Sequence, residues 1–260
     1  MSEGKLVWKK EGAIGWIVIT NVARRNAING EMWRSFPLAM AEFDADPEVR
    51  VVVLRGEGTV AFASGADISE FEKRRSDPEA AKAFDGVLDR ALLALENSAK
   101  PVIAMIHGIC FGGGVEISLA CDLRYAGGSS VFSIPAARLS IGYAVHGTNK
   151  LVATVGHAVA REILFTARRY NAQEAAEIGL VNRVLPDEEL EAYVRGVAGT
   201  LADNAPLSIA TSKSIIEQSV LPHPDFSRGE ELIRQCAGSE DHKEGRRAFM
   251  EKRKPQWKGK

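Results

Sequence analysis

A glycine-rich segment at residues 108–116, GICFGGGVE, carries the strongest chemical signal in the sequence. Consecutive glycines let a backbone approach a bound ligand closely. A helix that begins there would direct free N–H groups and its positive end at a developing negative charge. Glu116 would lie in the first turn, where the dipole favours its ionised form, so it is a candidate general base or water-orienting group. The simpler alternative is that the glycines only allow close packing and that Glu116 is a favourable N-terminal charge.

A second loop of small residues, AFASGAD at residues 61–67, has a similar setting. It follows the apolar run 51–54, just as the glycine cluster follows the apolar run 101–106. Short continuous apolar runs of this kind predict strands that are covered on both faces. Two loops that each follow such a strand could meet, which favours a ligand site over close packing alone.

The elements that must position these loops alternate between strand and helix. Residues 16–20 are rich in β-forming side chains, and residues 31–43 have apolar side chains at helical spacing. One crossover pattern of strand, turn and helix is formed by the run 101–106, the glycine turn and a helix predicted over 115–120. This succession predicts an α/β fold.

The second half of the sequence is mainly helical. Residues 151–166 predict a helix, and Asn171 with Glu174 resembles an N-cap residue and its N3 partner. We therefore predict a core over residues 1–200 and a helical C-terminal region over residues 201–260, with the usual boundary error of several residues.

The composition excludes several classes of protein. The 260 residues include 33 Lys and Arg against 34 Asp and Glu, a net charge of −1, and 45% are hydrophobic. These values argue against disorder and against nucleic-acid binding driven by global charge. The longest apolar stretch, 101–120, contains His107 and Glu116 and so falls short of the roughly 20 apolar residues that span a bilayer. The first ten residues resemble neither a secretory leader nor a transit peptide, so we expect a cytoplasmic protein that is not membrane-bound.

The cysteines are odd in number and lack CxxC spacing, which predicts neither a disulfide framework nor a cysteine-rich metal site. They are Cys110, Cys121 and Cys236. We interpret them as small buried side chains and expect no metal.

Together, the loop AFASGAD and the turn GGGVE resemble the enoyl-CoA hydratase/isomerase family of the crotonase superfamily, whose marks are an F-x-A-G-A-D loop and a G-G-G-x-E turn. The resemblance extends over nearly the whole chain, with further matches at residues 25–29, 126–147, 174–182, 239–245 and 248–255. It implies a crotonase-like spiral of repeated ββα units with a helical C-terminal trimerisation region, assembled as a homotrimer or a dimer of trimers. It also implies an acyl-CoA thioester substrate and no separate cofactor, because coenzyme A is part of that substrate.

The resemblance assigns roles to individual positions. The backbone N–H groups of Ala66 and Gly113 would form an oxyanion hole for the thioester oxygen of an enolate, and such donors are worth about 3 kcal/mol each. Other positions would border coenzyme A, the last two from a neighbouring subunit: Arg25, Asn26, Ala27, Ile28, Ala63, Phe249 and Lys252. The basic tail would suit the coenzyme A phosphates, although solvation alone also explains such a tail: Lys252, Arg253, Lys254, Lys258 and Lys260.

The sequence departs from the hydratase pattern at three positions. Hydratases of the family carry a second glutamate 20 residues after the first, and this chain has Ala136 there. Since alanine has no proton to transfer, water addition by two glutamates lacks one partner. Tyr143 and His146 stand where hydratases have proline and glycine, and either side chain is a candidate to supply the missing polar group. An ordinary packed tyrosine and a surface histidine are the alternatives.

These departures leave three functional hypotheses. The first is a lyase that hydrates 2-enoyl-CoA, with Glu116 and either Tyr143 or His146 as its catalytic side chains. The second is a malonyl-type decarboxylase, because methylmalonyl-CoA decarboxylases have an active-site tyrosine at the position of Tyr143 and lack the second glutamate. Those enzymes carry histidine at the position of Ala66, which counts against this hypothesis. The third is a non-catalytic member that binds coenzyme A or RNA, and the net charge makes RNA the weakest partner.

Overall fold

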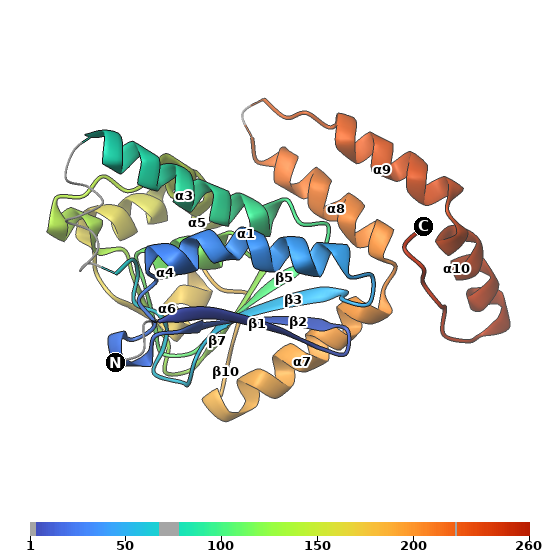
Figure 1. The fold of residues 1–260 in the computed structure, drawn as a ribbon, viewed down its shortest axis with the longest axis horizontal. Helices are drawn as coiled ribbons and strands as arrows, with labels where there is room; N and C mark the ends of the chain where they lie inside the picture. The colour runs from blue at the N-terminus through green and yellow to red at the C-terminus, as the bar shows by residue number, and fades with distance from the viewer. Residues whose placement is uncertain (1–3, 68–77, 222) are drawn as a thin grey trace.

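The computed structural model describes residues 4–67, 78–221 and 223–260, and Figure 1 shows the arrangement of their elements. In these ranges the strands form a larger sheet of order β1-β2-β3-β5-β7-β10 and a smaller one of order β4-β6-β8-β9. The larger sheet consists of β1 (Lys5–Glu11), β2 (Ile14–Thr20), β3 (Val51–Gly56), β5 (Val102–Ile106), β7 (Leu123–Gly127) and β10 (Arg183–Leu185). The smaller consists of β4 (Ala61–Ala63), β6 (Ile109–Phe111), β8 (Val131–Ser133) and β9 (Tyr170–Asn171).

Three times the chain passes from the larger sheet to the smaller sheet and then into a helix. The first unit is β3, β4 and α3 (Pro78–Glu96), and the second is β5, β6 and α4 (Gly113–Leu119). The third is β7, β8 and α5 (Val145–Thr166), joined through the short 3-10 helix η2 (Pro135–Leu139). Because β3, β5 and β7 pair in parallel, the repeats follow one another in space as they do in sequence. The predicted α/β class and the ββα spiral are confirmed.

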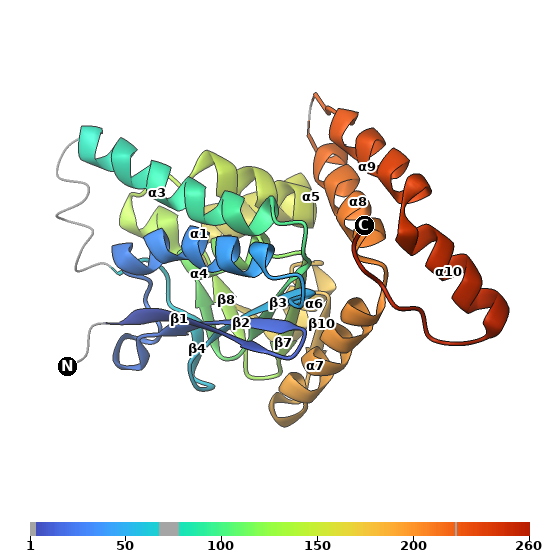
Figure 2. The same cartoon turned by 45° about the vertical axis from the view of Figure 1, so that its right-hand side comes forward.

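The central strands are buried on both faces, as their apolar runs predicted. In β3, Val52 and Leu54 belong to the core that contains α1 (Gly30–Ala45) and α3, whereas Val51 and Val53 pack toward α7 (Asp187–Asp203). Figure 2 shows α1 and α3 on one side of the larger sheet and α7 on the other. The alternation of side chains along a strand divides one apolar run between the two layers.

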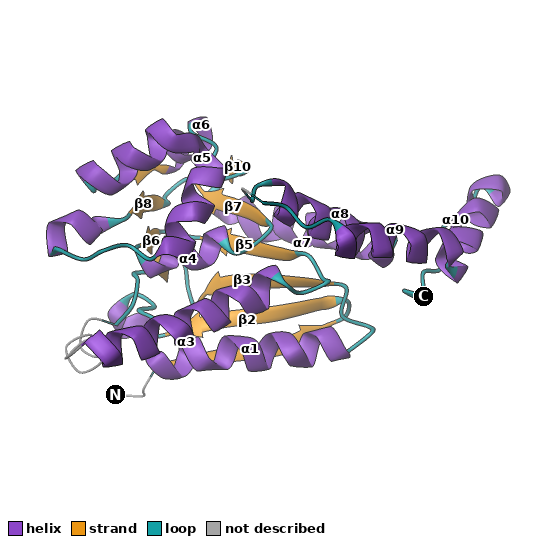
Figure 3. Cartoon of the chain, turned by 90° about the horizontal axis from the view of Figure 1, so that it is seen from above, coloured by secondary structure: helices purple, strands orange, loops and turns teal. Residues whose placement is uncertain are grey.

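The C-terminal helices are α8 (Pro206–Ser219), α9 (Ser227–Gly238) and α10 (Glu240–Glu251). The predicted boundary after residue 200 falls inside α7, whose Leu190, Val194 and Ala198 still pack on the sheet. In Figure 3, α9 and α10 project away from the sheets. After α10 the chain turns back, and the amides of Lys258 and Gly259 donate to Asp241 at 2.7 and 2.9 Å.

Local signals set several helix ends. A short helix, α6 (Ala172–Glu177), begins with the predicted capping box, in which the Glu174 amide donates to Asn171 and the Asn171 amide donates to Glu174. Near the other end of the chain, the 3-10 helix η1 (Val22–Arg24), which lies between β2 and α1, ends at Arg25 in a left-handed conformation. None of the described helices is long and apolar enough to cross a membrane.

Candidate active site

A cavity of about 340 Å³ lies where the loop after β4, the start of α4 and the segment from η2 to α5 meet. Most of its lining is apolar, and a few polar groups enter it. Among the lining residues are Trp33, Ala66, Gly113, Glu116, Ala136 and Tyr143. Such an enclosed apolar space with a few convergent polar groups is typical of a small-molecule site.

The two predicted oxyanion positions lie against each other on one wall of this cavity. Loop 64–67 is fixed beside loop 25–28, because the Ile28 amide donates to the Gly65 carbonyl at 2.8 Å. A methyl group added at Gly113 would lie 3.4 Å from the Ala66 nitrogen. Gly113 is the first residue of α4, so its N–H has no acceptor within the helix. The structure therefore brings these two amides together beside the positive end of a helix.

The glycines of the turn serve different purposes. A methyl group at Gly114 would lie 2.4 Å from the Ala63 carbonyl oxygen, so Gly114 is required for α4 to pack against β4. Gly112 has φ of +50°, a left-handed conformation that glycine adopts without strain. Close packing thus explains Gly114, whereas Gly112 and Gly113 line the cavity.

Glu116 is buried between the first turns of two helices. It is 6% exposed in the first turn of α4, and it contacts the first turn of α5. A methyl group added at Gly147 would lie 2.5 Å from Glu116 Oε1 and 3.0 Å from the ring of Tyr143. The positive ends of both helices face this region, which favours the carboxylate form.

Tyr143 contacts the same cavity from the opposite segment. Its hydroxyl donates a long hydrogen bond of 3.4 Å to the Gly112 carbonyl oxygen. Burial and the nearby Glu116 raise the pKa of Tyr143 well above its usual value, so the hydroxyl keeps its proton and acts as a donor. Ala136 lines the cavity as well, so the position of the second family glutamate does face the site but carries no carboxylate.

His146, the third predicted catalytic side chain, lies apart from Glu116 and Tyr143 in the described part of the chain. Its Nε2 lies 2.9 Å from Glu96 Oε1, and in the described part of the chain it is not among the residues that line the cavity. His146 is one residue before Gly147, but successive positions of an α-helix point to different faces, so His146 is directed away from the side of Gly147 that meets Glu116.

The predicted coenzyme A positions form two separate groups. Arg25 is exposed, and its carbonyl accepts from the Ser64 amide at 3.0 Å, so loop 25–28 does border the cavity loop. The buried side chain of Asn26 donates to the carbonyls of Ala61 and Glu57 at 2.7 and 3.1 Å, so it braces the loop. Ala27, Ile28 and Ala63 are buried.

The second group lies on the projecting C-terminal region. Phe249 is 83% exposed on α10, and Lys252 follows that helix, away from α4 and α5 of the same chain (Figure 3). The basic tail is partly paired within the chain, since Arg253 contacts Glu244 at 2.6 Å and Lys254 contacts Asp203 at 3.2 Å. Arg253 is therefore less suited to phosphate than the sequence predicted.

Sequence reasoning missed the helical side chains that line the cavity. Trp33 of α1 and Phe84 and Leu88 of α3 all contribute to its wall. Helical periodicity identifies an inward-facing position, but it does not tell a packed core from a ligand cavity. In the described ranges, no group of three or more His, Cys, Asp or Glu side chains converges as metal ligands.

Comparisons with known proteins agree over almost the whole chain. The family model described as "Enoyl-CoA hydratase/isomerase" matches residues 9–260. The short-chain-enoyl-CoA hydratase of Clostridium acetobutylicum is 34% identical over 256 residues, 98% of this chain and 97% of that protein. The methylmalonyl-CoA decarboxylase of Escherichia coli is 33% identical over 218 residues, 82% of each chain. A solved enoyl-CoA hydratase/carnithine racemase from Magnetospirillum magneticum is similar with a TM-score of 0.94 and 37% identity, covering 98% of this chain and 96% of its own.

Proposed function

From the premise that the chain belongs to the enoyl-CoA hydratase/isomerase family, we propose that it hydrates 2-enoyl-CoA thioesters through a thioester enolate. One observation carries the proposal: the amides of Ala66 and Gly113 and the carboxylate of Glu116 converge on one apolar cavity. Two of the similar proteins, a short-chain-enoyl-CoA hydratase and a crotonyl-CoA hydratase, support a short 2-enoyl chain.

The proposed reaction needs one carboxylate and two amides. Glu116 accepts a proton from water as the water oxygen bonds to Cβ of the substrate, and the electrons of the C=C bond move to the thioester oxygen. The amides of Ala66 and Gly113 stabilise this enolate oxygen. Collapse of the enolate takes the same proton from Glu116 to Cα, so that water is added and the carboxylate is restored. Coenzyme A enters as part of the substrate, and no other cofactor takes part.

Tyr143 has a supporting role in this scheme. Its protonated hydroxyl makes a long bond to the Gly112 carbonyl, a weak contact that leaves it able to donate to the water or to the acyl group. Because Ala136 offers no second acid, Tyr143 is the side chain we propose for orienting the reacting water.

Decarboxylation of a malonyl-type thioester is the second candidate. The observation that favours it is that Tyr143 and Ala136 face the same cavity as the two oxyanion amides. Loss of CO₂ would leave its electron pair on Cα and the thioester oxygen, so the enolate would form without a base. Glu116 would then be dispensable for enolate formation, which separates the two reactions experimentally.

We also propose that the active form is a trimer or a dimer of trimers in which α10 of one subunit lies near the cavity of another. Phe249 and Met250 are 83% and 80% exposed on α10, a large apolar surface for the end of a projecting helix. In such an assembly Phe249 and Lys252 would reach coenzyme A across the interface.

The decisive experiment compares Glu116→Gln with the unchanged protein on crotonyl-CoA and methylmalonyl-CoA. For hydration we expect kcat to fall at least about a hundredfold, within the range for loss of a general base. The loss of the conjugated thioester absorbance measures hydration, and release of CO₂ measures decarboxylation. The control is Glu188→Gln, an exposed carboxylate on α7.

Each outcome has one meaning. Hydration that survives Glu116→Gln would defeat the proposed role of the carboxylate. The decarboxylase would be favoured by two results together: the unchanged protein does not hydrate crotonyl-CoA, and Glu116→Gln still releases CO₂ from methylmalonyl-CoA.

A further inference from the structure

A cluster of charged side chains lies outside the cavity, beneath the first turn of α5. His146 Nε2 is 2.9 Å from Glu96 Oε1, and Lys150 Nζ is 3.4 Å from Glu96 Oε2. Lys150 also pairs with Glu217 of α8. Glu96 is the last residue of α3, and its side chain is 7% exposed. The cluster thus joins α3, α5 and α8 through a nearly buried carboxylate.

The first turn of α5 is also the wall that contacts the reacting groups. Gly147 is so close to Glu116 and Tyr143 that an added methyl would lie 2.5 and 3.0 Å from them. The N-cap residue of α5 is Ala144, which makes no side-chain hydrogen bond to the first turn in the described structure. A helix start without a capping side chain needs another contact if its position is to be held to a fraction of an ångström.

We propose that His146 and Glu96 form a positioning pair that fixes the first turn of α5, and thereby places Gly147 against the carboxylate of Glu116. The inference rests on the proposed role of Glu116 in hydration. The pair acts on the reaction only through that turn, since His146 does not line the cavity in the described part of the chain. Displacements of about 1 Å in such supports can cost about a hundredfold in rate.

The charges around His146 make the anchor depend on pH. Glu96 and Asp89 face it from α3 and Lys150 from its own helix, while Glu217 of α8 lies beyond Lys150. The hydrogen bond to Glu96 raises the pKa of His146 above its ordinary value, whereas burial and Lys150 oppose the rise. The contribution of the ion pair is therefore complete below the ordinary pKa of histidine and is lost as pH rises through the raised value.

The test uses the full chain and measures hydration of crotonyl-CoA. In Glu96→Gln and in His146→Gln we expect kcat to fall about tenfold while KM stays within about twofold, since the pair does not touch substrate. The double variant should be no slower than the slower single variant, because the two residues act as one unit. His157→Gln, an exposed histidine on α5, should keep the original rate.

The pH profile separates positioning from general stabilisation. In the unchanged protein, kcat should decline on the alkaline side with the pKa that an NMR titration assigns to His146. Both Glu96→Gln and His146→Gln should abolish that decline, because neither variant has an ion pair to lose as pH rises.

Two results would overturn the proposal. One is an unchanged kcat in His146→Gln, and the other is a lower kcat that follows a lower melting temperature while the alkaline decline stays in place. Failure of the proposed function looks different, because hydration would then survive Glu116→Gln whatever the variants of His146 do.

Discussion

The carboxylate of Glu116 sits where two short stretches of backbone leave space for it and for little else. The N-terminal turns of α4 and α5 both contact it, and Gly147 has no side chain to occupy the space beside the carboxylate, whereas Gly113 faces Ala66 and Trp33. Charge and shape therefore act together: the helix ends favour the anion, and Gly147 leaves room for it. Small changes at these two glycines should affect catalysis more than folding.

Gly147→Ala tests the space beside the carboxylate. The new methyl would lie 2.5 Å from Glu116 Oε1, and the far end of this side chain can move at little cost to folding. We expect kcat for hydration to fall about ten- to a hundredfold, with a small change in melting temperature. Gly196→Ala, a helical glycine of α7 whose added methyl meets nothing within 4 Å, is the control. A normal rate in Gly147→Ala would show that Glu116 is not confined as described.

Gly113→Pro tests the oxyanion donor. Proline removes the N–H but suits the first position of a helix, so α4 should still form. We expect kcat to fall at least about a hundredfold on either candidate substrate, because both reactions pass through an enolate. Gly113→Ala keeps the N–H and adds the same first carbon, 3.3 Å from the Trp33 ring, so it measures the effect of bulk alone. Equal rates in the two variants would contradict a donor role.

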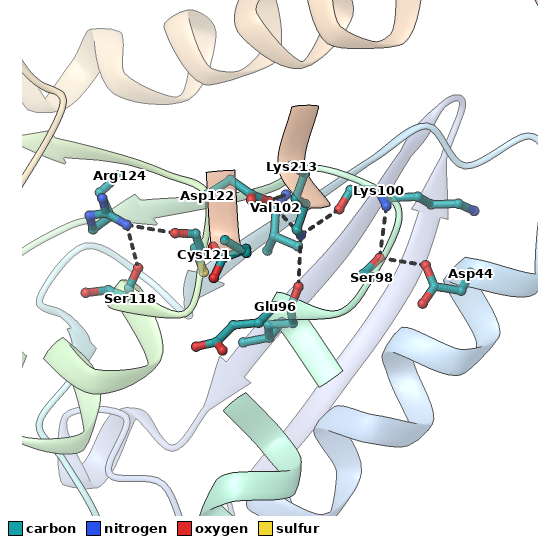
Figure 4. A network of polar contacts seen from close by, with 12 residues as sticks. Asp44, Glu96, Ser98, Lys100, Val102, Ser118, Cys121, Asp122, Arg124 and Lys213 are labelled. Atoms are coloured by element: carbon teal, nitrogen blue, oxygen red, sulfur yellow. Dashed lines mark hydrogen bonds and ion pairs between the residues drawn. The ribbon is translucent and has the colours of Figure 1, made fainter. Parts of the chain in front are cut away.

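At the scale of elements, polar contacts hold the ends of the helices around the site. Arg124 donates to the carbonyls of Cys121 and Ser118 at 2.7 and 3.3 Å, a cation at the C-terminal end of α4 (Figure 4). In the same view, Lys213 of α8 reaches Asp122 at 2.9 Å and the Lys100 carbonyl at 3.2 Å. Lys213 also donates to the Leu95 carbonyl at 3.1 Å. Asp122 also accepts from the amide at the start of β5 at 2.7 Å. One buried lysine thus joins the C-terminal helices to α3 and the sheet.

Lys213→Met tests this attachment. Removing the cation leaves Asp122 and two carbonyls without their shared donor, so we expect a loss of about 3 kcal/mol in the free energy of unfolding. Chemical denaturation of the purified protein measures it. Lys243→Met is the control, because Lys243 pairs with Glu240 on the exposed surface of α10 and should cost less than about 1 kcal/mol. Equal losses in the two variants would mean that α8 is held by apolar packing alone.

For the whole molecule, the distribution of apolar surface is the main feature. The C-terminal helices expose Ile216, Ile233, Phe249 and Met250, and Leu38 of α1 and Phe165 of α5 are exposed as well. The returning tail is fixed to its own chain, since Trp257 donates to the Asp203 carbonyl at 2.7 Å. The projecting helices are therefore ordered before any partner binds, and their exposed side chains are available to a second copy.

Phe249→Asp tests the proposed assembly. A charge at this position should disfavour burial between subunits, so sedimentation velocity should show a smaller species than the trimer or hexamer expected of the unchanged protein. The KM for the acyl-CoA should rise at the same time, because the neighbouring α10 would no longer border the substrate. Leu38→Asp, an exposed apolar position on α1, is the control. If the unchanged protein were a monomer, that result would contradict the proposed assembly.

The cytoplasmic location of the protein stays a prediction.

The sequence by itself predicted many of the elements, although neither β1 nor α3, and the two loops of small residues that line the cavity. Strand and helix periodicity, the glycine turn and the Asn171 cap are local patterns, so residues 51–54, 101–106 and 108–116 could be interpreted without knowledge of their neighbours in space. The absence of a second carboxylate at Ala136 was likewise visible in the sequence. The predicted division after residue 200 falls three residues before the end of α7, whose buried residues Leu190, Val194 and Ala198 pack on the sheet, and the division stays a prediction.

Only the tertiary structure decided what the polar side chains near the site do. Tyr143 and His146 were equal candidates in sequence, yet one contacts the cavity and the other pairs with Glu96, 50 residues away. Trp33 was one of the apolar positions at helical spacing in residues 31–43, and the structure places it with Phe84 and Leu88 of α3 in the wall of the cavity. These assignments depend on contacts between distant segments, and local pattern does not specify the direction in which a side chain meets another element.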